Sequence, residues 1–269
     1  MKTRSRQLRT SNLIEEWASQ GRYHFSTKDV SDELGKSTTA ARSALRRLKK
    51  RGRIASPQRG FHVTVPPEYR ELESLPAEQF VPQLLALSST PYYAALLTAA
   101  RLHGAGHQQP QSFQVMVDKN RRPIEVGRVR VQFIARLNAA LMPTDTVNTP
   151  RGVLRVSTPE TTAFDLVGYS EHCGGLDHVA TVLEELGEVI RPDLLASSAP
   201  KSPLPWCQRL GYLLDRFGHR DRTNALASFV ATQASDTVSL IPRQSADRAA
   251  RNARWKLLIN GEVETDFDP

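Results

Sequence analysis

Apolar residues at helical spacing predict two short helices at the start of the chain. The first has an apolar face formed by Leu8, Leu13, Ile14 and Trp17. Gly21 follows as a stop, and Ser26 or Thr27 provides a cap for the second helix. The second helix contains the apolar residues Val30 and Leu34, and Gly35 ends it. The pattern therefore predicts two short helices, each closed by a glycine.

A third helix, predicted from about Ser37 to Arg51, has one apolar and one polar face. The apolar face consists of Ala41, Ala44, Leu45 and Leu48. The opposite face is polar, and no acidic residue occurs between Glu33 and Glu68. After Gly52, residues 53–56 and 61–65 are expected to form two strands around the turn at 57–60. This order of elements indicates a winged helix-turn-helix.

The rest of the chain mixes helical and strand patterns. We expect helices at about 92–103, 174–188, 206–217 and 222–234, and a further helix that begins at 157–160. Strands are expected at 113–117, 129–134, around 147, at 153–156 and at 255–259. Ser157-Thr158-Pro159-Glu160 has the Ser-x-x-Glu capping pattern, and Asn260-Gly261 favours a type I′ turn. Residues 196–203, rich in Ser, Ala and Pro, resemble a connector.

These patterns predict an α+β protein with two main parts. Residues 1–66 form the winged helix-turn-helix, residues 67–88 a connector, and residues 89–269 a larger mixed α/β domain. A candidate sub-boundary lies near 196–205.

Positive charge is concentrated in the first of these parts. The net charge of the chain is +8, but residues 1–66 contain fifteen Lys or Arg and five Asp or Glu, an excess of ten positive charges. Residues 67–269 contain 21 basic and 23 acidic residues, a net charge of −2. This distribution predicts that the N-terminal part binds a polyanion and that the larger part does not coat one.

The polar face of the third helix is suited to double-stranded DNA, because a helix of this shape fits the major groove. The candidate base-reading residues are Thr38, Thr39, Arg42, Ser43 and Arg46. The candidate phosphate-binding residues are Lys36, Arg47, Lys49, Lys50, Arg51, Arg53 and Arg59. The alternative is that these cations only solvate an exposed helix end, where they also oppose the helix dipole favourably.

Composition excludes several other classes of protein. No apolar stretch approaches the length of a membrane helix, and the N-terminus leads into no signal-peptide core, so we expect a cytoplasmic protein with no membrane partner. Cys173 and Cys207 are the two cysteines and do not form a C-x-x-C pair, so we expect two reduced, structural thiols.

The sequence has weak signals for metal binding or catalysis. His103 and His107 are four residues apart, but Gly104 and Gly106 disfavour a helix that would hold both. His172, Cys173 and His178 do not have a recognised ligand spacing, and Asp266-Phe267-Asp268 resembles the paired carboxylates of nucleotidyltransferases without their Gly-Ser turn. Nucleotide-binding and serine-hydrolase motifs do not occur. We therefore predict no catalytic residues, no metal and no cofactor.

Several separated motifs resemble the AbiEi antitoxins of abortive-infection systems. These are Pro91-Tyr92-Tyr93-Ala94-Ala95-Leu96-Leu97-Thr98-Ala99-Ala100-Arg101-Leu102-His103-Gly104, His107–Gln111, Val156–Val167, Gly174-Gly175-Leu176-Asp177 and Arg254–Asn260 with Glu262-Val263-Glu264. The resemblance implies a type IV toxin–antitoxin regulator whose N-terminal winged helix represses its own operon by binding inverted repeats. It also implies that the C-terminal domain counteracts a nucleotidyltransferase-like toxin in phage defence. No catalytic residues carry over.

Two alternatives from other classes stay open. The chain could be a nucleic-acid-modifying enzyme that uses the basic module to deliver its substrate, with Asp165, Asp266 and Asp268 as its carboxylates. It could also be a transcription factor that senses a ligand and has no toxin partner. Turnover that depends on these carboxylates would favour the enzyme, and an operon without a toxin gene would favour the sensor.

Overall fold

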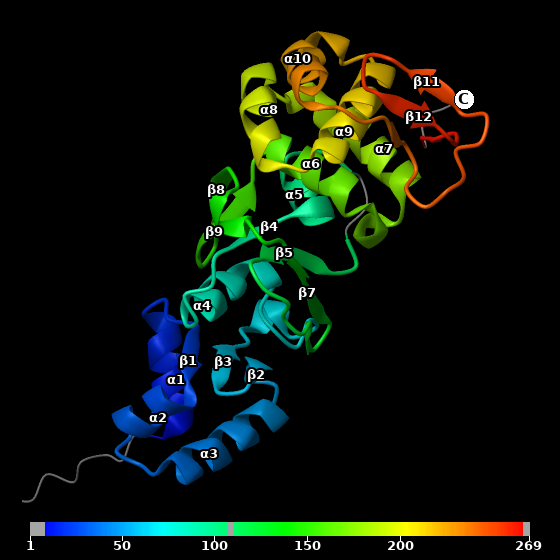
Figure 1. Ribbon diagram of the computed structural model, residues 1–269. Helices are drawn as coiled ribbons and strands as arrows, with labels where there is room; N and C mark the ends of the chain where they lie inside the picture. The colour runs from blue at the N-terminus through cyan, green and yellow to red at the C-terminus, as the bar shows by residue number, and fades with distance from the viewer. Residues whose placement is uncertain (1–8, 107–109, 266–269) are drawn as a thin grey trace, which may run out of the picture.

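The structure, a computed structural model, describes residues 9–106 and 110–265. The described chain is elongated: the N-terminal module lies at one end, and the helices near the C-terminus lie at the other (Figure 1). A mixed sheet lies between them. The predicted α+β fold, with a small helical and winged module before a larger α/β part, is confirmed.

The N-terminal module contains three helices and a three-stranded antiparallel sheet. Its elements are α1 (Thr10–Ser19), β1 (His24–Ser26), α2 (Thr27–Glu33), α3 (Thr38–Lys50), β2 (Ile54–Gln58) and β3 (Phe61–Thr64). The strand order is β1-β3-β2, and β2 and β3 form the predicted wing hairpin. The short strand β1 was not predicted, and Leu8 of the first predicted helix lies outside the described residues.

Local hydrogen bonds explain where α2 and α3 begin. The Ser26 hydroxyl accepts a hydrogen bond from the Asp29 amide at 3.0 Å, and the Asp29 carboxylate accepts one from the Ser26 amide at 2.9 Å. This reciprocal pair is a capping box at the start of α2. Ser37 accepts from the Ala40 amide at 3.3 Å and caps α3. Gly35, at φ +57°, allows the sharp turn between the two helices.

The larger part is organised around a six-stranded mixed sheet with the order β6-β7-β5-β4-β9-β8. Its strands are β4 (Tyr92–Ala94), β5 (Phe113–Val117), β6 (Ile124–Val126), β7 (Val129–Ala135), β8 (Thr144–Thr149) and β9 (Gly152–Ser157). The helices are α4 (Val81–Ala86), α5 (Leu96–Leu102), α6 (Pro159–Gly168), α7 (Leu176–Leu186), α8 (Pro192–Ser198), α9 (Leu204–Arg216) and α10 (Asn224–Gln233). A small sheet, in the order β10-β12-β11, follows them with β10 (Val238–Ser239), β11 (Ala250–Asn252) and β12 (Leu257–Ile259).

Four local predictions in this part are wrong. Tyr92–Ala94 form a strand of the sheet, and the helix begins only at Leu96. Thr158, rather than Ser157, caps α6 by accepting a hydrogen bond from the Thr161 amide. Residues 196–203 are mainly helical, and one hydrophobic core continues on both sides of them. Asn260-Gly261 is not a type I′ turn, because neither residue has the positive φ that this turn requires.

The wing and the larger sheet share one hydrophobic core. Phe61 and Val63 of the wing pack in the same buried cluster as Leu75 and Phe80, which lie between the two parts, and Val115 of β5. Strand β6 also lies beside strand β2 of the wing. The segment at 67–88, expected to be a connector, therefore contributes buried apolar side chains between the two parts.

Arg151, at the tip of the β8–β9 hairpin, reinforces this junction. Its guanidinium lies 4.0 Å from the ring centroid of Tyr23 in the N-terminal module and 3.2 Å from a carboxylate oxygen of Glu68. It also donates a hydrogen bond to Gln79, and its side chain is only 10% exposed. A residue of the larger part thus binds both the module and the segment that joins them.

Candidate DNA-binding surface

Helix α3 separates its apolar and basic faces as the sequence predicts. Ala41, Leu45 and Leu48 are buried against α1, α2 and the wing. All five candidate base-reading residues, Thr38, Thr39, Arg42, Ser43 and Arg46, are exposed. The helix lies at the end of the molecule farthest from the C-terminal helices (Figure 1). The larger part therefore leaves the polar face of α3 open to a DNA duplex.

The candidate phosphate-binding residues do not all lie in one place. Arg47, Lys49, Lys50, Arg51, Arg53 and Arg59 are exposed, and Lys36 is half-buried. Lys49 and Arg59 lie on the two sides of the groove between α3 and the wing. The Arg53 guanidinium instead forms an ion pair with Glu15 of α1 at 2.7 Å. Arg53 is thus the one member of the set held by a carboxylate among the described residues.

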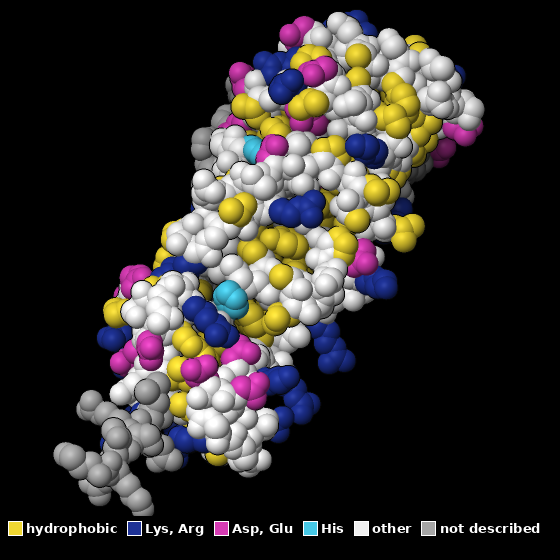
Figure 2. All heavy atoms as spheres, turned by 90° about the vertical axis from the view of Figure 1, so that its left-hand side faces the viewer, with side chains coloured by type: hydrophobic (Ala, Val, Ile, Leu, Met, Phe, Trp, Pro, Cys, Tyr) yellow, Lys and Arg dark blue, Asp and Glu magenta, His cyan; other side chains and the backbone are white. Residues whose placement is uncertain are grey.

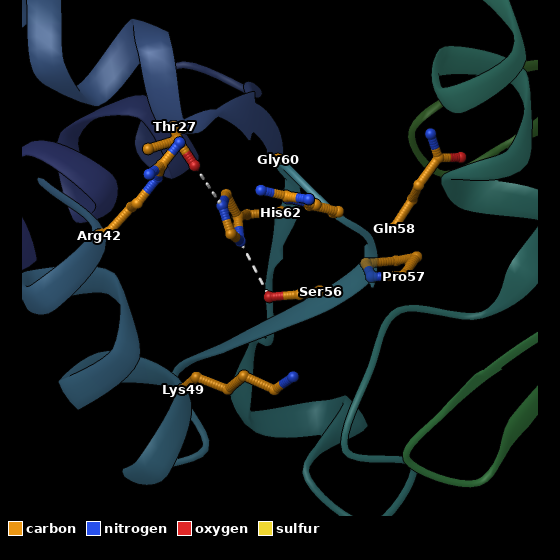
Figure 3. A pocket seen from close by; sticks show the side chains of 9 residues that line it. Thr27, Arg42, Lys49, Ser56, Pro57, Gln58, Gly60 and His62 are labelled. Atoms are coloured by element: carbon orange, nitrogen blue, oxygen red, sulfur yellow. Dashed lines mark hydrogen bonds between the residues drawn. The ribbon is translucent and has the colours of Figure 1, made fainter. Parts of the chain in front are cut away.

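The groove between α3 and the wing is an open basic cavity of about 720 Å³. Arg42 and Lys49 line it from α3, and Gln58 and Arg59 line it from the wing (Figure 3). Arg46 lines a smaller cavity that borders the same α3 residues. A backbone that follows this groove would have guanidinium or ammonium groups on both sides, which suits the phosphates of DNA.

His62 of β3 lies at the base of the groove and is held on both sides of its ring (Figure 3). Nε2 is 2.9 Å from the Thr27 hydroxyl, and Nδ1 is 2.9 Å from the Ser56 hydroxyl. Burial, and to a smaller extent the charge of Lys49, lower the pKa of His62. A neutral imidazole accepts at one nitrogen and donates at the other, so it can satisfy both hydroxyl groups.

Charge is segregated within the N-terminal module. All of its acidic residues, Glu15, Glu16, Asp29, Asp32 and Glu33, lie on α1 and α2. In Figure 2, acidic side chains lie among the basic ones on the side of the module that α1 and α2 form. Helix α3 and the wing contain no acidic residue. The excess positive charge therefore faces the groove side rather than surrounding the module.

The sequence did not identify the groove residues Thr27, Gln58 and His62, which are polar but uncharged. It also missed Arg121, in the loop between β5 and β6, which donates a hydrogen bond from Nη2 to Gln58 Oε1 at 2.6 Å. Burial lowers the pKa of Arg121. Arg121 lies 63 residues from Gln58 in the chain, and local sequence patterns do not report contacts at such separation. Arg121 fixes the wing tip to the larger part.

Other candidate chemical groups are engaged within the fold. Asp165 is fully buried, forms an ion pair with Arg136 and accepts a hydrogen bond from the Tyr93 hydroxyl at 2.9 Å. His103 Nε2 lies 2.6 Å from the Ser157 carbonyl oxygen. His107, Asp266 and Asp268 lie outside the described residues. Within residues 9–106 and 110–265, no three His, Cys, Asp or Glu residues form a group that could hold a metal ion.

Both cysteines are buried and unpaired with each other, in agreement with the prediction of two structural thiols. Burial raises the pKa of both Cys173 and Cys207 to about 12. No helix in the described part of the chain combines the length and apolar character needed to cross a membrane.

A three-helix module with a wing and an exposed basic third helix defines a winged-helix protein of the DNA-binding type. Two family profiles match the chain and together span more than half of it. The profile described as a transcriptional regulator, AbiEi antitoxin, matches residues 12–61, and that of the AbiEi antitoxin C-terminal domain matches residues 93–216. The chain belongs to the AbiEi family of antitoxins and transcriptional regulators, which confirms the resemblance seen in the sequence.

A solved structure shows the same fold. The chain is similar to the Rv2827c protein from Mycobacterium tuberculosis, with a TM-score of 0.65 and 19% sequence identity over 93% of this chain and 90% of that chain. No curated protein matches the chain. Membership of the family supports a DNA-binding antitoxin.

Proposed function

We propose that this protein represses its own toxin–antitoxin operon by binding inverted repeats in the promoter through α3 and the wing. It acts in the cytoplasm and counteracts a cognate nucleotidyltransferase-like toxin, as a type IV system in phage defence. The observation that carries the DNA-binding half is the basic groove lined by Arg42, Lys49 and Arg59, together with the exposure of all five candidate base readers on α3. Family membership supports the antitoxin half.

DNA binding and action against the toxin belong to separate parts of the chain in this proposal. Residues 1–66 bind DNA, residues 67–88 join the two parts, and residues 89–269 act against the toxin. The toxin-directed part is one unit, because one hydrophobic core includes Leu166 of α6, Leu195 of α8 and Leu226 of α10. Thr38, Thr39, Arg42, Ser43 and Arg46 read bases, and Lys36, Arg47, Lys49, Lys50, Arg51, Arg53 and Arg59 bind phosphates.

Hydrogen-bond chemistry supports this division of the two residue sets. Arginine can donate two hydrogen bonds to a guanine edge, and the side chains of Arg42 and Arg46 have no partner within the described chain. Lysines at the end of α3 add electrostatic affinity and little sequence information. The Arg53 guanidinium must first leave Glu15, so Arg53 is expected to contribute the least of the phosphate-binding set.

A nucleic-acid-modifying enzyme is a weaker explanation of the same basic module. Such an enzyme would need Asp165 as an accessible carboxylate, whereas Asp165 is buried in contact with Arg136 and Tyr93. The Asp165 carboxylate, held by Arg136 and Tyr93, therefore helps to fix α6 against the sheet and is not accessible to a substrate.

Binding of the full-length protein to its own promoter, compared with a scrambled duplex of the same length, tests the repressor half. We expect tighter binding to the promoter, with an affinity that falls steeply as salt rises. Equal affinity for the two duplexes would remove the repressor role. The antitoxin half is tested separately, by co-expression with the toxin encoded beside it: failure to restore growth would remove that half alone.

A further inference from the structure

A second cleft lies on the larger part, away from α3. It has a volume of about 310 Å³ and lies between the connector, helix α5 and the start of strands β5 and β7. Leu72, Leu102 and Phe113 form its apolar wall, and Arg101, Arg128 and Arg130 form its charged rim. Cavities of this size that combine an apolar wall with a few converging polar groups are typical of small-molecule sites.

The three arginines of this cleft have no anionic partner in the described part of the chain. None of their guanidinium groups forms an ion pair or hydrogen bond there, and all three side chains are exposed. Glu78 is the one carboxylate that lines the cleft among the described residues, and it forms no ion pair with them. The cleft therefore has an excess of two positive charges, although residues 67–269 as a whole have a net charge of −2.

Close backbone packing anchors the turn that carries Arg128, one of these arginines. A Cβ atom on Gly127 would collide with the Leu72 carbonyl oxygen and with Glu73, so only glycine permits this approach. The Arg128 amide donates a hydrogen bond to the same Leu72 carbonyl at 2.9 Å. The backbone of Arg128 is therefore held in a tight turn, and Arg130 follows two residues later on strand β7.

We propose that this cleft binds a small organic anion that contains phosphate groups. The arginines bind the phosphates, since their planar guanidinium groups donate paired hydrogen bonds to phosphate oxygens. The wall of Leu72, Leu102 and Phe113 covers the organic part. The volume limits the occupant to a molecule of about the size of a nucleotide or a sugar phosphate. The site is separate from the DNA groove and independent of the proposed repressor role.

Titration calorimetry on the full-length protein without DNA tests this site, with adenosine diphosphate and inorganic pyrophosphate as the probes. We expect adenosine diphosphate to bind with one site per chain and more tightly than pyrophosphate, because only the former uses the apolar wall. The double variant Arg128→Ala/Arg130→Ala should bind at least about ten-fold more weakly, as expected when charge-assisted hydrogen bonds are lost. No detectable binding of either probe overturns the proposal.

A matched control separates a local effect from a general loss of charge. Arg220→Ala/Arg248→Ala removes the same charge from two exposed arginines outside the cleft and should leave binding unchanged. Equal weakening in both double variants refutes a specific site. Promoter binding gives an independent readout: if only the cleft variant weakens it and flattens its salt dependence, with no change in anion binding, the arginines contact DNA and the proposal is wrong.

Discussion

Arg46→Ala gives the sharpest test of the DNA-binding surface. Arg46 lies on the exposed face of α3, and its guanidinium has no partner among the described residues. Alanine is an equally good helix former, so the stability of the module should change by no more than a few tenths of a kcal/mol, roughly. Nearly the whole effect of the substitution should therefore appear in DNA binding rather than in folding.

The expected loss depends on what Arg46 contacts. A bidentate contact to a guanine edge is worth about 1–3 kcal/mol, which corresponds to an affinity for the promoter lowered by about 5- to 150-fold. Specificity should relax at one base pair of the site, while affinity for scrambled DNA changes little. Lys50→Ala, on the same exposed face, is the matched control, since loss of a phosphate contact should weaken binding to every sequence alike.

Fluorescence anisotropy with a labelled promoter, a set of single-base variants and a scrambled duplex would measure these effects at several salt concentrations. Loss of one phosphate contact should make the slope of log K against log salt shallower by about 0.9. If Arg46→Ala weakens binding equally on all duplexes with that change of slope, Arg46 binds phosphate and the base-reading assignment is wrong. Unchanged binding would refute the assignment of α3 as the recognition helix.

Three further predictions concern the stability of the full-length protein in urea. Arg151→Ala should lower the free energy of unfolding by about 2 kcal/mol, because it removes the stacking on Tyr23 and the partly buried ion pair at the junction. Ser26→Ala should cost about 1 kcal/mol, because α2 loses the capping box with Asp29. Because burial lowers the pKa of His62 below its usual value of 6.5, stability should be constant above pH 6.5 and fall as the pH drops below it.

Each of these measurements has a control in the same chain. Arg130→Ala and Ser43→Ala change exposed residues and should leave the free energy of unfolding within about 0.5 kcal/mol of that of the unsubstituted protein. His62→Gln should reduce the acid-dependent loss of stability without abolishing it, since burial also lowers the pKa of His24. A pH profile that His62→Gln leaves unaltered would show that its ring is as easily protonated in the folded chain as in the unfolded one.

The N-terminal module could be predicted from the sequence because its signals are local. Ser37 caps α3 by accepting a hydrogen bond from the nearby Ala40 amide, and Gly35 makes the turn before it. The helical spacing of Ala41 and Leu45 defines the buried face. The basic face of α3 could also be recognised from the local spacing of its residues. The groove was not predictable, because His62 and Gln58 reach it only through the packing of the wing against α3.

The larger part was harder to predict because its decisive interactions are distant in the chain. Tyr92–Ala94 have helical spacing, but the strand is favoured because they hydrogen-bond between β5 and β9 in the middle of the sheet. Residues 196–203 have the composition of a linker, yet Ser198 and Ala199 among them are buried, and Ala199 belongs to the same core cluster as Leu195. Residues 67–88 contain polar stretches that give no sign of a core residue, but Phe80 is buried in one cluster with Phe61 and Val63 of the wing.

The core shared by the wing and the sheet changes how truncated proteins should be interpreted. A fragment that ends at residue 66 would expose Phe61, Val63 and Val65 to water, since their covering residues lie beyond the cut. Weak repression by such a fragment would reflect a damaged wing and would not show that the missing residues touch the promoter. Genetic dissection of the two activities is therefore better done with point substitutions in the intact chain.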